Sequence, residues 1–248
     1  MGDAYTNSRG NAGSPGVFTH LNHGGWPMHD AVPAFIYWMD LVGTFVFGLT
    51  GAFRAIKYEL DILGVLVLST AVGVGGGMTR DVLLGFTPPV AISGPNYLLT
   101  TCLAGLCVFF FARKIAPSWR LILYADGVGL AVFTAVGAEK AFVAGLGPVG
   151  IMVIATIASC GGGVIRDTLT REIPTVFTDD IYATAALAGG LAYWLAAKAG
   201  LDGRTPFYIA LGVVSALRFI ALRLGLNLPR SRRLPRSPSE IAAGKNER

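Results

Sequence analysis

Charged side chains are scarce in this 248-residue sequence, where Asp, Glu, Lys and Arg make up 14% of the residues. Soluble domains carry about 25%, and 53% of the residues here are hydrophobic. This balance excludes an ordinary water-soluble domain and predicts an all-α, multi-pass membrane protein. We do not expect an enzyme, because no Ser–His, Cys–His or paired His/Asp set lies within the apolar segments.

Cysteine and histidine are also few. The three cysteines are odd in number and lie within apolar segments, which excludes a disulfide framework and favours buried thiols. The three histidines lie in a Gly/Asn/Ser-rich N-terminal stretch without cysteine, so we expect no metal site and no cofactor. These residues are Cys102, Cys107, Cys160, His20, His23 and His29.

Long apolar segments, in contrast, are abundant. Seven segments have about the 20 residues that a helix needs to cross a bilayer. They cover residues 33–53, 62–84, 97–112, 119–138, 148–168, 181–198 and 206–226. The sequence therefore predicts seven transmembrane helices.

The chain contains an internal repeat with a period of 86 residues. The segment GGGMTRD at 75–81 returns as GGGVIRD at 161–167, and the same interval relates Pro88 to Pro174, Asp40 to Asp126 and Arg54 to Lys140. Each repeat holds three predicted helices, an odd number, so the second repeat is expected to be inverted in the membrane. The predicted organisation is an N-terminal segment (1–32), repeat one (33–118), repeat two (119–204), a seventh helix (205–225) and a tail (226–248).

Each copy of the repeated motif places three glycines inside a membrane-spanning segment. Glycine lowers the free-energy cost of interrupting a helix, so we expect broken helices whose freed carbonyl groups face a transport path for a cation. The simpler alternative is that the glycines let two helices pack closely. The six candidate path-lining residues are Gly75, Gly76, Gly77, Gly161, Gly162 and Gly163.

Charged residues accompany the glycines within the apolar segments, where they are rare and often functional. From the rise of 1.5 Å per helical residue, Asp40 and Arg80 are expected at one depth of the bilayer, and Asp126 and Arg166 at the opposite depth. The sequence thus predicts two carboxylate–guanidinium pairs that bracket the glycines. Static ion pairs that only hold helices together are the alternative. Asp81 and Asp167 follow the two arginines directly.

Positive charge predicts the orientation. The segment 223–248 holds seven of the Lys and Arg residues, so it is expected in the cytoplasm, as a disordered tail that contacts anionic lipids rather than nucleic acid. With seven helices the N-terminal segment is then extracytoplasmic. We expect a multi-pass protein of the cell inner membrane with Arg54 and Arg166 on the inner side, and Arg80 and Lys140 on the outer side.

The doubled motif reads GGGMTRDVLLGFTPP in one copy and GGGVIRDTLTREIP in the other, each repeat starts with D..G..VF...GA, and the predicted helices are arranged as three plus three plus one. In these features the sequence resembles the prokaryotic branch of the trimeric intracellular cation (TRIC) channels over about residues 33–225. This resemblance implies a homotrimer with one pore per protomer that conducts monovalent cations, chiefly K⁺. It also implies that kinked second and fifth helices line the pore at the glycine triplets. Lys140, in GAEKA, matches a lysine of the animal members.

A second function uses the same architecture. A secondary carrier of a small zwitterion such as glycine would present helix ends to a carboxylate and an amine. Unitary current without countertransport would identify a channel, whereas saturable exchange would identify a carrier. A membrane scaffold without transport is the weakest hypothesis, because it gives the intramembrane charges no role.

Overall fold

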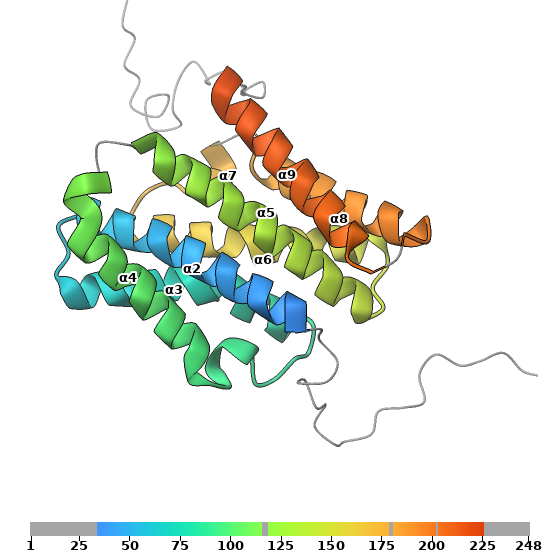
Figure 1. The fold of residues 1–248 in the computed structure, drawn as a ribbon, viewed down its shortest axis with the longest axis horizontal. Coiled ribbons are helices and arrows are strands. Elements are labelled where there is room, and N and C mark those ends of the chain that lie inside the picture. The colour runs from blue at the N-terminus through green and yellow to red at the C-terminus, as the bar shows by residue number, and fades with distance from the viewer. Residues whose placement is uncertain (1–33, 116–118, 179–180, 202, 226–248) are drawn as a thin grey trace, which may run out of the picture. The chain divides into compact units, whose positions relative to one another are not determined.

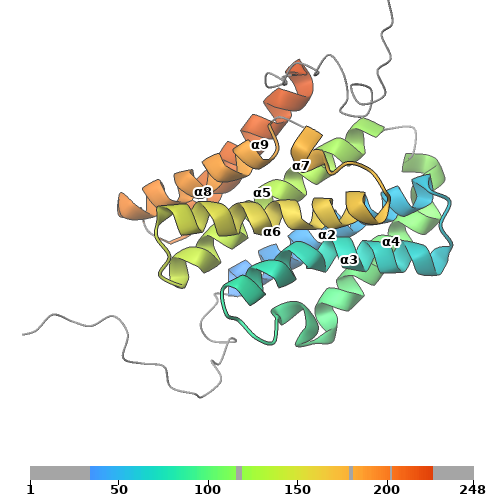
Figure 2. The same ribbon diagram turned by 180° about the vertical axis from the view of Figure 1, so that it is seen from behind.

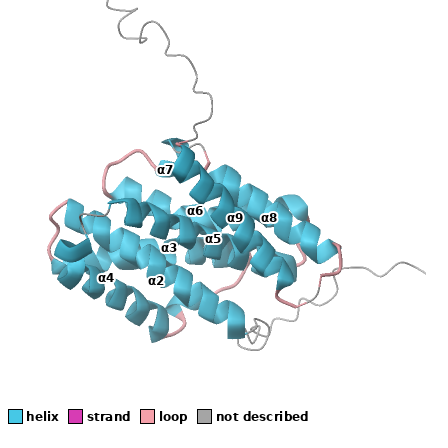
Figure 3. Cartoon of the chain, turned by 45° about the horizontal axis from the view of Figure 1, so that its top comes forward, coloured by secondary structure: helices cyan, strands magenta, loops and turns pink. Residues whose placement is uncertain are grey.

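The computed structural model describes residues 34–115, 119–178, 181–201 and 203–225, and all regular structure in these ranges is helical (Figures 1 and 3). Seven long helices follow the seven predicted segments, with ends within five residues of the predicted ones. They are α2 (Ala34–Lys57), α3 (Ile62–Leu83), α4 (Pro95–Ile115), α5 (Trp119–Val143), α6 (Pro148–Leu169), α8 (Ala183–Lys198) and α9 (Thr205–Leu224).

Two short helices were not predicted. The 3₁₀ helix η1 (Val90–Ile92) follows α3, and α7 (Thr175–Thr178) follows α6. Each follows one of the two prolines that the 86-residue interval relates: α7 comes directly after Pro174, and η1 begins two residues after Pro88. The predicted N-terminal segment with its three histidines, and the basic tail, lie outside the described residues.

Local sequence sets the helix ends. The side chain of Asp61 caps α3 by accepting the backbone N–H of Gly64 at 2.7 Å. Pro148 opens α6, where its missing N–H is not needed. Gly225 ends α9 in the left-handed conformation, with φ +60°.

Five helices within the described residues are long and apolar enough to cross a membrane. They are Ala34–Lys57, Ile62–Leu83, Ile122–Val143, Pro148–Leu169 and Thr205–Leu224. The apolar part of α4 is shorter, at Pro95–Phe111. Helix α8 has 16 residues, or about 24 Å at 1.5 Å per residue, against a hydrocarbon core of about 30 Å.

Helices α3 and α6 lie side by side (Figure 2). Helix α2 packs on α3, and α5 packs on α6 in the same way; α4 covers α2 and α3, while α8 covers α5 and α6, and α9 packs on α5 and α8. Phe47 of α2 and Phe133 of α5, which are 86 residues apart, stack with ring centroids 5.2 Å apart and are fully buried. The core is therefore assembled from matching contacts of the two repeats.

Candidate functional site

The first charge cluster consists of Asp40, Arg80, Asp81 and Lys140, contributed by α2, α3 and α5. The Arg80 guanidinium binds both carboxylate oxygens of Asp40, with Nη1–Oδ1 3.1 Å and Nη2–Oδ2 2.9 Å. All four side chains are at most 4% exposed. The Asp40–Arg80 pair predicted from helix depth is therefore confirmed, and its geometry is the bidentate one that favours arginine.

Further bonds make this pair part of a network. Arg80 Nε donates to Asp81 Oδ1 at 2.9 Å, and Lys140 Nζ bridges Asp40 Oδ2 (3.3 Å) and Asp81 Oδ1 (3.2 Å). The Tyr97 hydroxyl donates to Asp40 Oδ2 at 3.1 Å. Two carboxylates thus balance two cations, as buried charges require.

The second charge cluster consists of Asp126, Arg166, Asp167 and Arg54. Arg166 donates from Nη1 to Asp126 Oδ1 at 2.6 Å and from Nε to Asp167 Oδ1 at 2.8 Å. Arg54 Nη2 donates to the same Asp167 oxygen at 3.2 Å. The backbone N–H and the hydroxyl of Thr175 donate to Asp167 Oδ2 at 2.8 and 2.7 Å. The predicted Asp126–Arg166 pair is also confirmed.

Each cluster takes one cation from the other repeat, an exchange that the prediction of isolated pairs missed. Lys140 of repeat two enters the first cluster, and Arg54 of repeat one enters the second. The signal was present in the sequence, because these two residues are 86 apart and each was predicted on the same side of the membrane as the arginine that it joins. Depth alone did not reveal the contact, since it says nothing about which helix faces point at one another.

The two clusters differ in how completely their carboxylates are bound. Asp40 accepts bonds from three residues, whereas Asp126 accepts only from Arg166 within the described residues. Tyr182 precedes α8 much as Tyr97 lies near the start of α4, and its hydroxyl is buried with no hydrogen-bond partner among the residues that the structure describes. The second cluster is therefore the less saturated of the two.

The two clusters also differ in the size of the cavity beside them, and the larger cavity lies at the second cluster. The cavity at the first cluster, lined by Asp40, Thr44, Val74, Gly77, Arg80, Asp81, Ala91 and Tyr97, has no room for a water molecule. In the cavity at the second cluster, the centre of a water-sized sphere can move within a volume of about 40 Å³. This volume exceeds the minimum that one water molecule needs. Its lining is Thr50, Phe53, Arg54, Ile122, Leu123, Asp126, Arg166, Thr175 and Arg218. The two cavities share no lining residue.

The glycine triplets lie where α3 crosses α6. A Cβ atom on Gly76 would come within 2.1 Å of the Ala158 carbonyl oxygen, and one on Gly162 within 2.5 Å of the Val72 carbonyl oxygen. Both helices are uninterrupted through the triplets, so the prediction of broken helices with freed carbonyl groups is wrong. The glycines permit close helix packing here, because the two backbones can approach each other where no side chains lie between them.

Other members of the triplets touch the charge clusters. Gly77 lies beside Arg80 and Phe133, and Gly163 lies beside Arg166 and Tyr182. Gly75 packs against the side chain of Ile165, and Gly161 against Gly76. The structure thus brings all the predicted site residues into one continuous region, with a charge cluster on each side of the glycine crossing.

Beyond the end of α2, Glu172 accepts hydrogen bonds from Lys57 Nζ at 2.8 Å and from Arg54 and Tyr58. These bonds lower the pKa of Glu172 to about 2, and the bond from Lys57 has the largest effect. The bond to the Glu172 carboxylate raises the pKa of Tyr58. The 86-residue repeat gives no signal for this group, because the residue 86 positions before Glu172 is the uncharged Phe86.

These features define a helical, multi-pass membrane protein with duplicated buried charge clusters. Residues 37–113 and 123–198 match the family described as Glycine transporter. The chain is 40% identical over 205 residues to a UPF0126 membrane protein of Deinococcus radiodurans, covering 81% of this chain and 93% of that protein. It is 37% identical over 197 residues to the UPF0126 inner membrane protein YadS of Escherichia coli, covering 78% and 95%. The chain therefore belongs to the family that is described as Glycine transporter and is related to the UPF0126 membrane proteins.

Solved structures agree with this assignment and confirm the resemblance to TRIC channels. A structure from work on conductance through TRIC cation channels aligns with a TM-score of 0.75 at 33% identity, covering 81% of this chain and 98% of that chain. A TRIC trimeric intracellular cation channel orthologue from Rhodobacter sphaeroides aligns with a TM-score of 0.75 at 34% identity, covering 78% and 100%. The fold described above is therefore the TRIC fold.

Proposed function

We propose that this protein is a homotrimeric channel for monovalent cations, chiefly K⁺, with a pore in each protomer. The observation that carries the proposal is the likeness to TRIC cation channels along nearly their whole length, at one-third sequence identity. The duplicated site supports it, because a channel needs no strong binding site and the central region is built from glycine backbone and paired charges.

The proposed path runs between α3 and α6 at the six glycines, flanked by Asp40, Arg80, Asp81, Asp126, Lys140, Arg166 and Asp167. The backbones of the two helices touch at Gly76 and Gly162, so conduction requires the helices to separate there. At Gly76 and Gly162 the atoms that have to part first are backbone atoms, while the side chain of Ile165 packs against the neighbouring Gly75. We therefore assign the described conformation to a state that is closed at the glycine crossing.

The proposed topology has seven spans and an inverted repeat, with the N-terminus outside and the C-terminus in the cytoplasm of an inner membrane. The matching contacts of the two repeats support it, as does the positive charge that follows α9. Helix α8 is short for a full crossing, and local bilayer thinning would accommodate it. Cysteines placed at position 5 and position 240 should react with an impermeant reagent from opposite faces; reaction from the same face would refute the odd number of spans.

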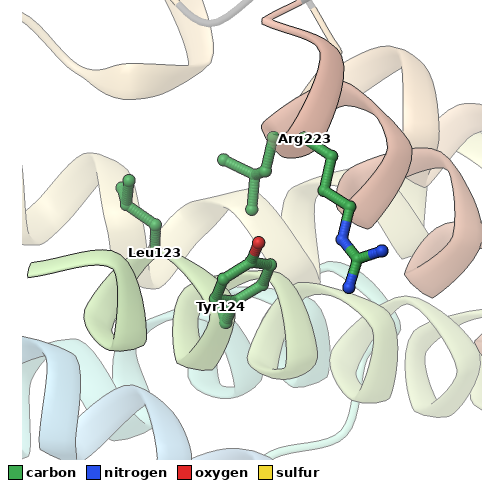
Figure 4. A pocket seen from close by; sticks show the side chains of 4 residues that line it. Leu123, Tyr124 and Arg223 are labelled. Carbon is green, nitrogen blue, oxygen red and sulfur yellow. The ribbon is translucent and has the colours of Figure 1, made fainter. Parts of the chain in front are cut away.

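We also propose an anionic-lipid contact at the α5–α9 end. A cavity of about 380 Å³ lies between Leu123, Tyr124, Leu222 and Arg223, with the Arg223 guanidinium and the Tyr124 hydroxyl at its edge (Figure 4). The sequence adds further arginines a few residues after Arg223. Arg223→Gln should weaken binding of phosphatidylglycerol in native mass spectrometry, whereas Arg204→Gln, at the start of α9, should not; equal effects would refute this contact.

A carrier of glycine is the second candidate, favoured by the description of the family model. Purified protein in a planar bilayer with asymmetric KCl separates the two. A channel gives unitary currents that reverse near the K⁺ equilibrium potential, and protein-free bilayers give none. Saturable exchange of labelled glycine in liposomes, without unitary current, would overturn the channel proposal in favour of the carrier.

A further inference from the structure

Glu172 lies in the α6–α7 loop and binds three side chains from the end of α2. Its carboxylate accepts hydrogen bonds from Lys57 at 2.8 Å, from Arg54 and from Tyr58, and its side chain is 30% exposed. The residue related by 86 positions is Phe86, which has no carboxylate. This link between the two repeats therefore exists at one end of the path only.

The backbone turn that presents Glu172 is shared by both repeats. The Phe86 N–H donates to the Asp81 carbonyl at 2.8 Å, and the Glu172 N–H donates to the Asp167 carbonyl at the same distance. The preceding residue has positive φ in both turns: Gly85 at +77° and Arg171 at +58°. A residue with a Cβ adopts this left-handed conformation less readily than glycine does.

The consequence concerns Arg54, the counterpart of Lys140. Lys140 bridges the two carboxylates of its cluster, Asp40 and Asp81. Arg54 instead bridges Asp167 and Glu172. If the two clusters bound their cations alike, the second carboxylate partner of Arg54 would be Asp126, the counterpart of Asp40. In the structure that second partner is Glu172.

Within the described part of the chain Asp126 has one hydrogen-bond partner, Arg166, beside a cavity that has room for water, and Arg54 and Arg218 line the same cavity. At the other end, where Lys140 does reach Asp40, no such room remains. The two clusters therefore differ both in the partners of the exchanged cation and in the room left for water.

We propose that Glu172 is a positioning residue that holds Arg54 away from Asp126, and so keeps room for water beside the Asp126 carboxylate at this end of the path. Without Glu172, Arg54 would turn toward Asp126, as Lys140 reaches Asp40 in the other cluster, and would fill the cavity that it lines. The consequence for conduction rests on the proposed channel function, but the effect on hydration does not.

The test measures access to the cavity directly. Ile122 lines it, so Ile122→Cys, in a chain whose three native cysteines are replaced by alanine, is treated with the cationic thiol reagent MTSEA. Glu172→Gln should slow the reaction about tenfold, because the local concentration of cations falls and the cavity closes. Glu59→Gln removes the same charge from an exposed glutamate just beyond α2 and should leave the rate unchanged. Adding Arg54→Gln to Glu172→Gln should restore the rate.

An unchanged rate in Glu172→Gln, or equal slowing in Glu59→Gln, would overturn the inference. If Glu172→Gln does not fold, Arg54→Gln alone still decides, since it should react at least as fast as the parent; slower reaction would contradict the proposal. Single-channel recording of the same variants keeps the two proposals apart. Slowed labelling with no current in the parent protein supports the role of Glu172 and refutes the channel, whereas normal current with unchanged labelling does the reverse.

Discussion

The α3–α6 crossing gives a prediction with a calculable size. A Cβ added at Gly76 would lie 2.1 Å from the Ala158 carbonyl oxygen, whereas carbon–oxygen contacts normally begin at about 3.3 Å. The helices must separate by about 1 Å in Gly76→Ala, because the contacted atom belongs to a backbone and has no rotamer to change. Such overpacking costs about 1–3 kcal/mol, and alanine recovers about 1 kcal/mol of helix propensity. For a contact as short as this one we take the upper end of the overpacking cost, about 3 kcal/mol, which leaves a net loss of about 2 kcal/mol in the free energy of unfolding for Gly76→Ala.

Gly162→Ala should lose about 1 kcal/mol, since its contact with Val72 is looser, at 2.5 Å. Gly77→Ala is the matched control from the same triplet: the nearest atom, Arg80 Nη2, is 3.6 Å from the added Cβ, so this variant should be neutral or slightly stabilised. Equilibrium unfolding in mixed detergent micelles measures all three. Equal stabilities of the Gly76 and Gly77 variants would refute the close crossing, and with it the proposal that the path opens by separation of these helices.

Three further predictions concern the charges. Asp40→Asn and Arg80→Gln should each destabilise the protein by about 3–5 kcal/mol, because each leaves a buried charge without its partner. The double mutant should recover about 0.5–3 kcal/mol relative to the sum of the two single effects. Recovery of the same kind in Asp40→Asn/Arg166→Gln would show that the partners are wrong. Tyr97→Phe should cost about 1.5–3 kcal/mol, the range for a bond to a charged group, and Tyr182→Phe should be neutral or stabilising; the reverse order in thermal unfolding would contradict the described hydrogen bonds. The pKa of Glu172 is lowered to about 2 from an ordinary 4.5, so the contribution of its carboxylate to the stability of the fold is complete above pH 4.5 and disappears as the pH falls toward 2. The melting temperature of Glu172→Gln should therefore differ most from that of the parent at pH 6 and least near pH 2. A difference that stays constant with pH would exclude this linkage.

The glycine triplets illustrate how one pattern can support two structures. Their place inside apolar segments and the charges beside them were visible in the sequence, and both features were interpreted as a broken helix. The observed helices continue through the triplets, because the missing side chains are compensated by contact with a second helix. Which of these outcomes occurs depends on whether another backbone lies within reach, and that is a property of the packed molecule.

The sequence alone determined the membrane environment, the seven helices to within five residues, the 86-residue repeat and the two carboxylate–guanidinium pairs. All of these follow from hydrophobicity, periodicity and helical rise, which act along the chain. Only the tertiary structure decided that Lys140 and Arg54 exchange between the repeats, that Arg54 binds Asp167 and Glu172, and that the cavity at one cluster has room for water while the other has none. These outcomes depend on the direction of helix faces and on a loop residue without a symmetric counterpart, because burial and pairing are set by neighbours that are distant in the sequence.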